Sequence, residues 1–447
     1  IGARGTSMCV AYRASCNDPT AIYWNPATLS LLPDSTGNSV LLNTQLIWND
    51  FRYDPADTLV SAINLLRDEE SAMTSPSFAV PHLFSAHRYP GLAGVHFGMG
   101  IYSPFGVAST WDVLKDDDLD YAIGINGRSV FPLLPDSMFE LTLTDELPEE
   151  DFQGRIMAYS FSPSVAVDIG ERLSLGASFI YTLSSFEVTM PSIDSARIMA
   201  DTGVVFQDAE MMGSSVGINA GIVYSPIENI RLAATVRAEQ KIRYEGDYRD
   251  RTYKFYNEYL SGLLGGSRLA GGYVEGEWTD AWADLPRPLQ LGCGVAWDVN
   301  DDLTVELDYS FTDWSVMDTL SVLTAETDST VAVIPLNWED SHRLSVGAEY
   351  RLSSQYALRC GVFFEPHPAV PEYQNLFIPD FHDQVAVNLG FGGSWGSFDM
   401  DLSGELEYFG EKTIEPNFEN GGSYSVNIPG DYTGWIGALT LGITYNF

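Results

Sequence analysis

The sequence predicts an all-β protein, in which a 14-stranded antiparallel transmembrane β-barrel surrounds an N-terminal plug. Three features predict this fold. Apolar and polar residues alternate with a period of two over segments of about ten residues, the length of a tilted strand that crosses a bilayer. Short turns alternate with long polar loops, as they do in outer-membrane barrels. An irregular segment of small and turn-forming residues precedes all the strands.

Charge and composition exclude other classes of protein. The 447 residues include 23 Lys or Arg and 61 Asp or Glu, which gives a net charge of -38. We exclude nucleic-acid binding, because it needs a cationic surface to neutralise phosphates. An aromatic content of 13% is too high for a disordered chain. No apolar run is long enough for a transmembrane helix, whereas alternating strands give only a weak hydropathy signal.

The plug is predicted at residues 1–38 and the barrel at residues 39–447. The central stretch of the plug runs from Ala21 to Leu29 and contains the turn signal Asn25-Pro26. Since the chain starts at Ile1 without an apolar leader, we expect either that a signal peptide was removed or that the chain was trimmed. Cys9 and Cys16 either form a disulfide in an oxidising periplasm or remain free thiols.

Fourteen strands are expected from the alternation. They lie at about 39–52, 77–88, 92–104, 153–169, 172–190, 212–225, 229–245, 271–299, 303–314, 341–352, 355–365, 381–392, 396–410 and 433–447. The eighth contains Pro286 and Pro288, which cannot donate to a ladder, so it is either two strands or one bent strand. Cys293 and Cys360 fall on the apolar faces of their strands, where they would face lipid.

The C-terminal strand ends on an aromatic residue. Its apolar face carries Leu439, Leu441, Ile443, Tyr445 and Phe447. This pattern resembles the assembly signal of bacterial outer-membrane barrels, which implies the barrel-assembly machinery as a partner. The alternative is an ordinary strand that happens to end the chain.

Several segments in order along the chain resemble the long-chain fatty-acid transporter (FadL/TodX) family of outer-membrane proteins. They are Gly2-Ala3-Arg4 with Tyr23-Trp24-Asn25-Pro26-Ala27, then Gly100 to Gly106, Leu307 to Ser315, and Asn337 to Arg343. The resemblance implies a Gram-negative outer-membrane location and passive uptake of long-chain fatty acids or aromatic hydrocarbons. It also implies that Tyr23, Trp24, Asn25, Pro26 and Ala27 form a gate that moves when ligand binds.

The sequence departs from the family at Cys9 and Val10, where small residues are usual, and at Thr28, where glycine is usual. Residues 181–191, where a carboxylate-binding cation is expected by resemblance, contain no Arg or Lys. Neutral hydrocarbons therefore remain candidates beside fatty acids.

The long loop at 105–151 is rich in apolar side chains. The candidate ligand-binding residues are Phe105, Trp111, Leu114, Phe131, Leu134, Met138 and Phe139. Such a cluster marks either a capture site for hydrophobic molecules or a small core packed over the barrel mouth. The acidic runs at 116–118 and 149–151 either bind divalent cations that bridge to lipopolysaccharide or form a solvated surface.

Charged residues are also expected inside the barrel, where they would hold the plug in a paired network. They are Arg231, Arg237, Glu306, Asp308, Arg343 and Arg359. Gly94, Gly98 and Gly100 weaken the third strand. By resemblance, a kink there opens a lateral exit into the membrane; the alternative is close packing of the plug against small residues.

We expect no enzyme activity, no metal and no cofactor. The six histidines are scattered, and no hydrolase, zinc or nucleotide-binding motif occurs. The expected partners are hydrophobic small molecules and outer-membrane lipid, and the expected oligomeric state is a monomer. The competing hypothesis is a structural or adhesive barrel whose acidic loops bind ions or partners without transport.

Overall fold

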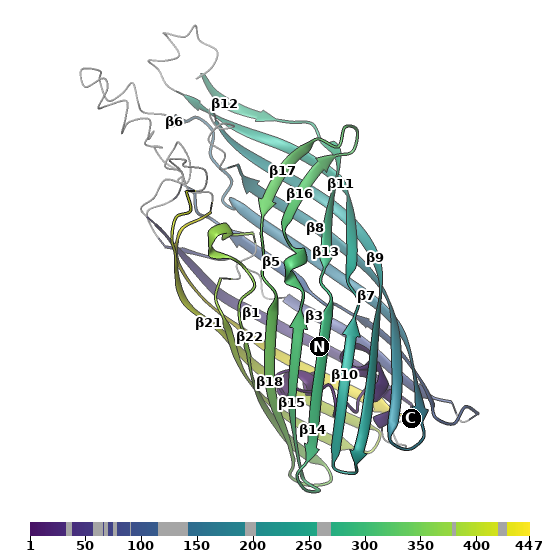
Figure 1. Ribbon diagram of the computed structural model, residues 1–447. Helices are drawn as coiled ribbons and strands as arrows, with labels where there is room; N and C mark the ends of the chain where they lie inside the picture. Colours follow the sequence, from purple (N-terminus) through teal and green to yellow (C-terminus); the bar gives the residue numbers. More distant parts are fainter. Residues whose placement is uncertain are drawn as a thin grey trace.

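The computed structural model describes residues 1–32, 38–56, 66, 70–74, 78–89, 91–114, 142–192, 203–256, 270–377, 381–418 and 427–447. The wall is a closed antiparallel barrel of 14 strands, as predicted. Figure 1 shows the N-terminal segment, in purple, lying across the lumen near the end that carries the tight turns. No helix in these residues is both long and apolar enough to cross a membrane.

Nine wall positions are each occupied by one strand. They are β1 (Asn38–Pro55), β3 (Phe78–Arg88), β7 (Phe152–Ile169), β8 (Leu173–Pro191), β9 (Gly203–Ile227), β19 (Tyr356–Glu365), β20 (Gln384–Trp395), β21 (Phe398–Ile414) and β22 (Gly430–Asn446). The ring closes where β22 pairs with β1, from Ser39 opposite Asn446 to Pro55 opposite Gly430.

The other five wall positions are each occupied by two strands in line. They are β4 (Val95–Tyr102) with β5 (Gly106–Trp111), β10 (Ile230–Arg237) with β11 (Gln240–Tyr256), β14 (Gln290–Asp298) with β13 (Thr279–Arg287), β15 (Leu303–Thr312) with β16 (Thr319–Thr324), and β18 (Ser341–Arg351) with β17 (Thr330–Pro335). Short strands β2 (Ser71–Ala72), β6 (Thr142–Leu143) and β12 (Ala270–Glu275) pair at the loop end.

The outer surface of the barrel is apolar, as a lipid-facing wall requires. On β22, Leu439, Ile443, Tyr445 and Phe447 are exposed outward, while Thr440 and Thr444 are buried inside. Cys293 and Cys360 are exposed on the same outer surface, as expected. Cys9 and Cys16 are buried free thiols, so the disulfide alternative is wrong.

The segment 271–299, predicted as the eighth strand, occupies one wall position as separate strands in line. β14 pairs with β10 and β13 pairs with β11, with the interruption at residues 288–289. The strands also continue beyond the predicted ends: β9 starts at Gly203, and residues 315–340, expected as a loop, contain β16 and β17. Alternation predicts strands only where one face meets lipid, and these extensions lie past that region.

Candidate functional site: the plug and the lumen

The turn at Asn25 is fixed by its own side chain. The plug contains α1 (Ala3–Ser7), α2 (Ala21–Trp24) and the 3-10 helix η1 (Pro26–Leu31). Asn25 caps η1, because its Oδ1 accepts the N–H of Ala27 at 3.1 Å, and Pro26 suits the first helical position. Its Nδ2 donates to the carbonyls of Arg13 at 3.1 Å and of Ile222 in β9 at 3.2 Å. Asn25 therefore shapes the plug and bonds it to the wall.

Wall glycines provide the space for this turn. A Cβ on Gly221 of β9 would lie 2.0 Å from Asn25 Oδ1, and one on Gly176 of β8 would lie 2.2 Å from the nitrogen of Ala27. No side chain fits at these distances, so glycine is required where the wall backbone meets the plug.

Two buried carboxylates of β15 bind the plug backbone. Asp308 Oδ2 accepts the N–H groups of Tyr12 at 3.3 Å and Arg13 at 3.2 Å, and Glu306 Oε1 accepts the N–H of Ala14 at 2.6 Å. The guanidinium of Arg13 lies 3.6 Å from Asp308 and also donates to Ser310. These two predicted lumen residues hold the plug directly.

A second group of charges holds α1. Asp401 of β21 accepts Arg4 Nε of the plug at 3.1 Å and Arg359 Nη1 of the wall at 2.8 Å. Arg359 also donates to Glu349 at 2.7 Å. Arg359 was predicted, whereas Asp401 and Arg4, which complete the bridge, were not.

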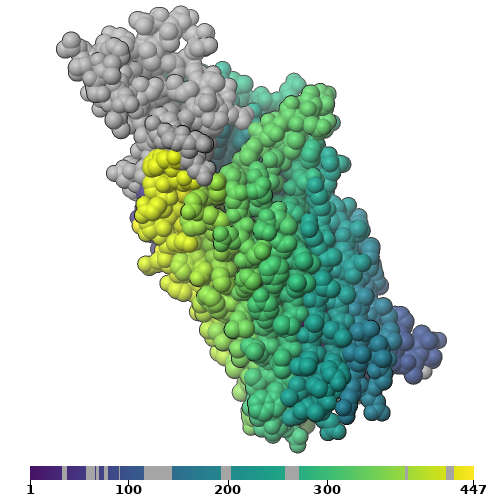
Figure 2. All heavy atoms as spheres, in the orientation of Figure 1, coloured from purple at the N-terminus to yellow at the C-terminus, as the bar shows by residue number. Residues whose placement is uncertain are grey.

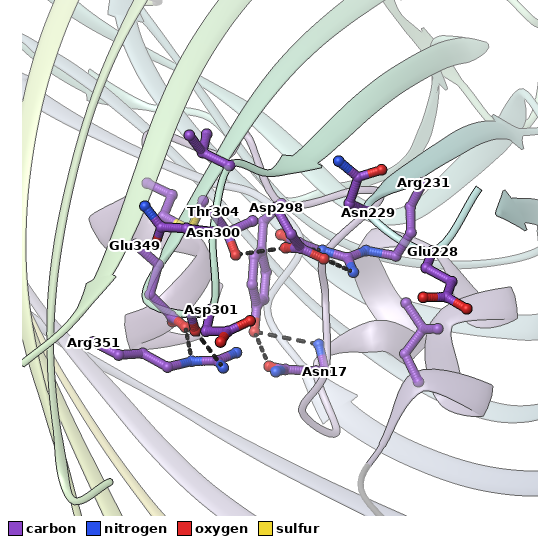
Figure 3. Close-up of a pocket in the computed structure, with 15 residues that line it drawn as sticks. Asn17, Glu228, Asn229, Arg231, Asp298, Asn300, Asp301, Thr304, Glu349 and Arg351 are labelled. Carbon is purple, nitrogen blue, oxygen red and sulfur yellow. Dashed lines mark hydrogen bonds and ion pairs between the residues drawn. The ribbon is translucent and has the colours of Figure 1, made fainter. Parts of the chain in front are cut away.

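The remaining predicted charges occupy other levels of the lumen. Arg231 makes two hydrogen bonds with Asp298, at 2.6 and 2.9 Å, beside a polar cavity of about 820 Å³ below the plug (Figure 3). Arg343 pairs with Glu365 above the plug. The six predicted charges therefore do not form one network.

The gate candidates Tyr23 and Trp24 lie on the upper side of the plug. Arg237 Nη2 donates to the carbonyl of Tyr23 at 2.8 Å, and its guanidinium carbon lies 4.3 Å from the centre of the Tyr23 ring. Asn219 Nδ2 donates to the same carbonyl at 3.0 Å. The Trp24 ring packs edge-on against Tyr23, with centroids 4.8 Å apart.

A chamber of about 310 Å³ lies above the plug, and three arginines, Arg13, Arg237 and Arg343, line it together with Glu365. Arg287 is not among the lining residues; its guanidinium carbon lies 5.2 Å from the centre of the Phe105 ring. Neither Arg237 nor Arg287 forms an ion pair with any carboxylate of the described chain; their polar partners are Gln290, the Tyr23 carbonyl and Gln240. Sequence reasoning missed Arg13 and Arg287, and the only signal for Arg287 was its position between two prolines.

The described loop candidates are packed rather than exposed. Trp111 and Leu114 are each 1% exposed in an apolar cluster at the barrel mouth, and Trp111 Nε1 donates to the Leu376 carbonyl at 3.1 Å. Asp151 Oδ2 accepts the N–H groups of Val113 and Leu114, both at 2.6 Å. Phe131, Leu134, Met138, Phe139 and the acidic run 116–118 lie outside the described residues.

The third wall position breaks just after the predicted glycines. Gly94 adopts a φ of 74° in the turn before β4. Gly98 and Gly100 lie in regular β4 pairing and face the plug, where a Cβ would meet Ile22 at 2.8 and 3.2 Å. The strand is interrupted at residues 103–105, and β5 then pairs with β7 alone among the described strands.

This interruption leaves a gap in the wall. Residues 79–82 of β3 pair with β1 but have no described partner on their other side. The gap is bounded above by a hydrogen bond of 2.8 Å from the N–H of Thr74 to the carbonyl of Thr110. A cavity of about 360 Å³ lies inside it, and Ile47, Phe51 and Val107 contribute to its lining.

A closed barrel with a plug and an apolar outer wall defines a bacterial outer-membrane transport protein. The family described as outer membrane protein transport protein (OMPP1/FadL/TodX) matches residues 149–447, and the chain belongs to this family. Its location is therefore the outer membrane of a Gram-negative cell.

The similar proteins agree with this assignment. The long-chain fatty acid transport protein of Escherichia coli strain K12 is 28% identical over 164 residues, which cover 37% of this chain and 35% of that relative. The match thus spans about a third of that relative's length. Two solved structures share the fold: a FadL homologue from Pseudomonas aeruginosa (TM-score 0.75, 18% identity, 100% and 98% of the two chains) and the Ralstonia pickettii toluene transporter TbuX (0.69, 16%, 100% and 98%).

Proposed function

We propose that the protein carries hydrophobic molecules across the outer membrane by passive diffusion, and that the preferred cargo bears a carboxylate, as long-chain fatty acids do. The observation that supports this cargo is the pair Arg237, which lines the chamber above the plug, and Arg287; neither has an acidic partner among the described residues. A cation removed from water is costly unless an anion binds it, and arginine binds carboxylates in a two-pronged geometry. The relative from Escherichia coli, which is named a long-chain fatty acid transport protein, agrees with this choice of cargo.

Ligand binding would act on the plug through Arg237. Its guanidinium now donates to the carbonyl of Tyr23. A carboxylate in the chamber would compete for the same guanidinium, because a charged acceptor is stronger than a carbonyl. Tyr23 and Trp24, followed by the turn Asn25-Pro26-Ala27, would then be freed to shift. This contact makes the plug a gate that responds to an anionic cargo.

The cargo would leave through the gap between β3 and β5. The cavity of about 360 Å³ joins the inner side of the gap and includes apolar residues of β1 and β5. An apolar chain that passes through the gap enters the membrane without crossing the periplasm. The interruption between β4 and β5 lies at Ser103-Pro104-Phe105, and Gly98 and Gly100 provide the plug contact beside it.

Aromatic hydrocarbons are the second candidate cargo, because the solved toluene transporters share the fold. A purely structural or adhesive barrel is less favoured, since one chamber lies beside the plug and a second cavity lies inside the gap in the wall. We further infer that the protein is a monomer whose whole outer wall contacts outer-membrane lipid. β22 would be the strand that the assembly machinery recognises. Glu149 and Glu150 would be available to cations at the lipopolysaccharide surface. Transport by diffusion needs no catalytic group.

Uptake into proteoliposomes tests the proposal. Empty vesicles set the background for oleate and for toluene. Substitution of Arg237→Gln should lower oleate uptake about tenfold, because a hydrogen bond to a charged group is worth about 1.5–3 kcal/mol. Toluene uptake should not fall. Arg231→Gln is the matched control, since Arg231 lies below the plug and pairs with Asp298.

Two results would contradict the proposal. Oleate uptake equal to that of empty vesicles would exclude transport, and unchanged oleate uptake in Arg237→Gln would exclude the carboxylate site. A loosened plug alone would raise the leakage of both compounds, so it is distinguishable from the loss of a carboxylate contact.

A further inference from the structure

Four neighbouring wall positions are interrupted at the same level. The interruptions are residues 238–239, 288–289, 313–318 and 336–340. The strand register aligns them, because Arg237 pairs with Gln290, Gln290 with Thr312, and Thr312 with Ser341. Figure 1 shows β16 and β17 continuing above β15 and β18 past this level. The strand interruptions are therefore aligned across this side of the barrel.

Along this line, one seam has no backbone ladder. β13 pairs with β16 only from Ala281 to Ala283, and the next bond across the seam runs from the N–H of Asp313 to the carbonyl of Leu289 at 3.0 Å. Between these points residues 284–288 face residues 314–321, all of them described, and no backbone hydrogen bond joins the two stretches. We call these two stretches the window.

Apolar side chains of the window face the barrel interior. Leu285, Met317 and Leu320 are buried in one cluster, and Trp314 packs against it. Figure 2 shows this face, in green, as a continuous surface of atoms. Side-chain rotation needs no strand separation, so this seam can open more easily than a bonded pair of strands.

The window lies at the upper border of the lipid-facing surface. Leu291, Tyr309 and Phe364, just below it, are exposed outward at 43%, 39% and 46%. Ser315 and Asp318 of the window itself are exposed polar residues. Aromatic residues mark the membrane interface in barrels, so the window opens at the head-group level of the outer leaflet.

A cation lies at the edge of the window. Arg287 faces the lumen and contacts the Phe105 ring, and among the described residues its one polar partner is Gln240 Oε1, at 3.5 Å. The arginine chamber reaches the lower edge of the window, because Leu291, Thr312 and Trp314 help to line it. On the outer edge, Asp284 is neutralised by Lys241 Nζ at 2.9 Å. The cation Arg287 thus lies on the lumen side of the window, while the polar residues Ser315 and Asp318 lie on its outer side.

We propose that the window binds a single-chain anionic amphiphile of the outer leaflet, with its head group on Arg287 and its alkyl chain between Leu285 and Met317. The site is an access route from the leaflet, and it is separate from the gap between β3 and β5. It rests on the proposed function only in taking the cargo to be amphiphilic. The unpaired cation selects the anionic head group, and the seam without a ladder accepts the chain.

Photocrosslinking in proteoliposomes tests the site. A palmitate analogue with a mid-chain diazirine is dissolved in the bilayer and irradiated, and adducts are mapped by mass spectrometry. We expect adducts at residues 314–321. Arg287→Gln should lower them about tenfold, while Arg287→Lys should retain most of them, because the charge carries the contact. Arg155→Gln is the matched control, since Arg155 is exposed and lies 3.8 Å from Glu187.

Absence of adducts at the window, or adducts that persist unchanged in Arg287→Gln, would overturn the proposal. Oleate uptake measured in the same vesicles separates this inference from the proposed function. Uptake without window adducts refutes only the window. Window adducts without uptake refute transport and leave the binding site in place.

Discussion

Two plug residues, Cys9 and Val10, have a left-handed backbone without being glycine, with φ of 50° and 61°. For a β-branched valine this conformation is a genuine outlier, and such strain costs about 1–3 kcal/mol per residue. The strained pair separates two parts of the plug. Residues 1–8 are bonded to Asn43, Asn388 and Asp401, whereas residues 12–31 are bonded mainly to β8, β9, β10 and β15. The plug can therefore bend at Cys9-Val10 while one part stays attached.

The thiol of Cys9 reports on such bending. Burial raises the pKa of Cys9 to about 12, and burial followed by the charge of Asp18 raises that of Cys16 well above its ordinary value. A raised thiol pKa leaves almost no thiolate at pH 7, and the thiolate is the nucleophile. We expect N-ethylmaleimide to modify Cys9 very slowly in the closed protein. As long as the pH is below that pKa, each rise of one pH unit should increase the rate of modification about tenfold.

Mass spectrometry of the modified peptide gives the rate. Oleate should accelerate modification of Cys9 if cargo moves the plug. The same peptide in urea supplies the reference rate for an exposed thiol. Modification of Cys9 at the urea rate in folded, cargo-free protein would contradict a buried thiol in a closed plug.

Only some of these residue contacts were predictable. The Asn-Pro turn is local, so the sequence indicated Asn25 correctly as the centre of the plug. Its wall partner Ile222 lies 197 positions away, and no local pattern connects the two. By resemblance, a carboxylate-binding cation was expected in residues 181–191, with Arg343 or Arg359 as alternatives, whereas Arg237 and Arg287, which have no acidic partner among the described residues, come from β10 and β13. Only the closure of the barrel brings them close together.

At the scale of elements, the fit between the plug and the wall strands depends on backbone contact. We predict that Gly221→Ala unseats the plug, because its Cβ would lie 2.0 Å from Asn25 Oδ1. The barrel should still form, since the new methyl group points into the lumen. Gly404→Ala is the matched control: its Cβ would meet only Leu439, at 3.8 Å. Single-channel conductance in planar bilayers should rise for Gly221→Ala and stay at the wild-type level for Gly404→Ala. Equal conductance of both variants would show that the plug does not need this contact.

Strand positions were predictable where lipid imposes alternation. β15, β18 and β19 begin and end within three residues of the expected bounds, because apolar residues on one face oppose polar residues on the other. β16 and β17 were missed, since their ladder stands above the lipid-facing surface and no outward apolar face is needed there. The seam between β13 and β16 was not predictable either, because it depends on which residues of two separate strands pair and not on the pattern of one segment.

At the scale of the whole molecule, the charge of the chamber above the plug differs in sign from the net charge of the chain. The net charge is -38, yet Arg13, Arg237 and Arg343 line one chamber in the lumen beside a single acidic lining residue, Glu365. An excess of cations in a cleft concentrates anionic ligands there. The acidic majority keeps the protein away from other polyanions, while the chamber keeps an attraction for a single carboxylate.

The strand ladders that close the barrel contain no plug residue. Every wall position bonds to two other wall positions, except at the gap and the window, and the ring is completed by β22 and β1. Deletion of residues 1–32 removes none of these ladders and leaves Glu306, Asp308 and Asp401 to be hydrated by lumenal water. We therefore expect far-UV circular dichroism of the deletion variant to match the intact protein, single-channel conductance to rise, and oleate uptake to lose its dependence on Arg237. A deletion variant that fails to form a barrel would show instead that the plug is required for assembly of the wall.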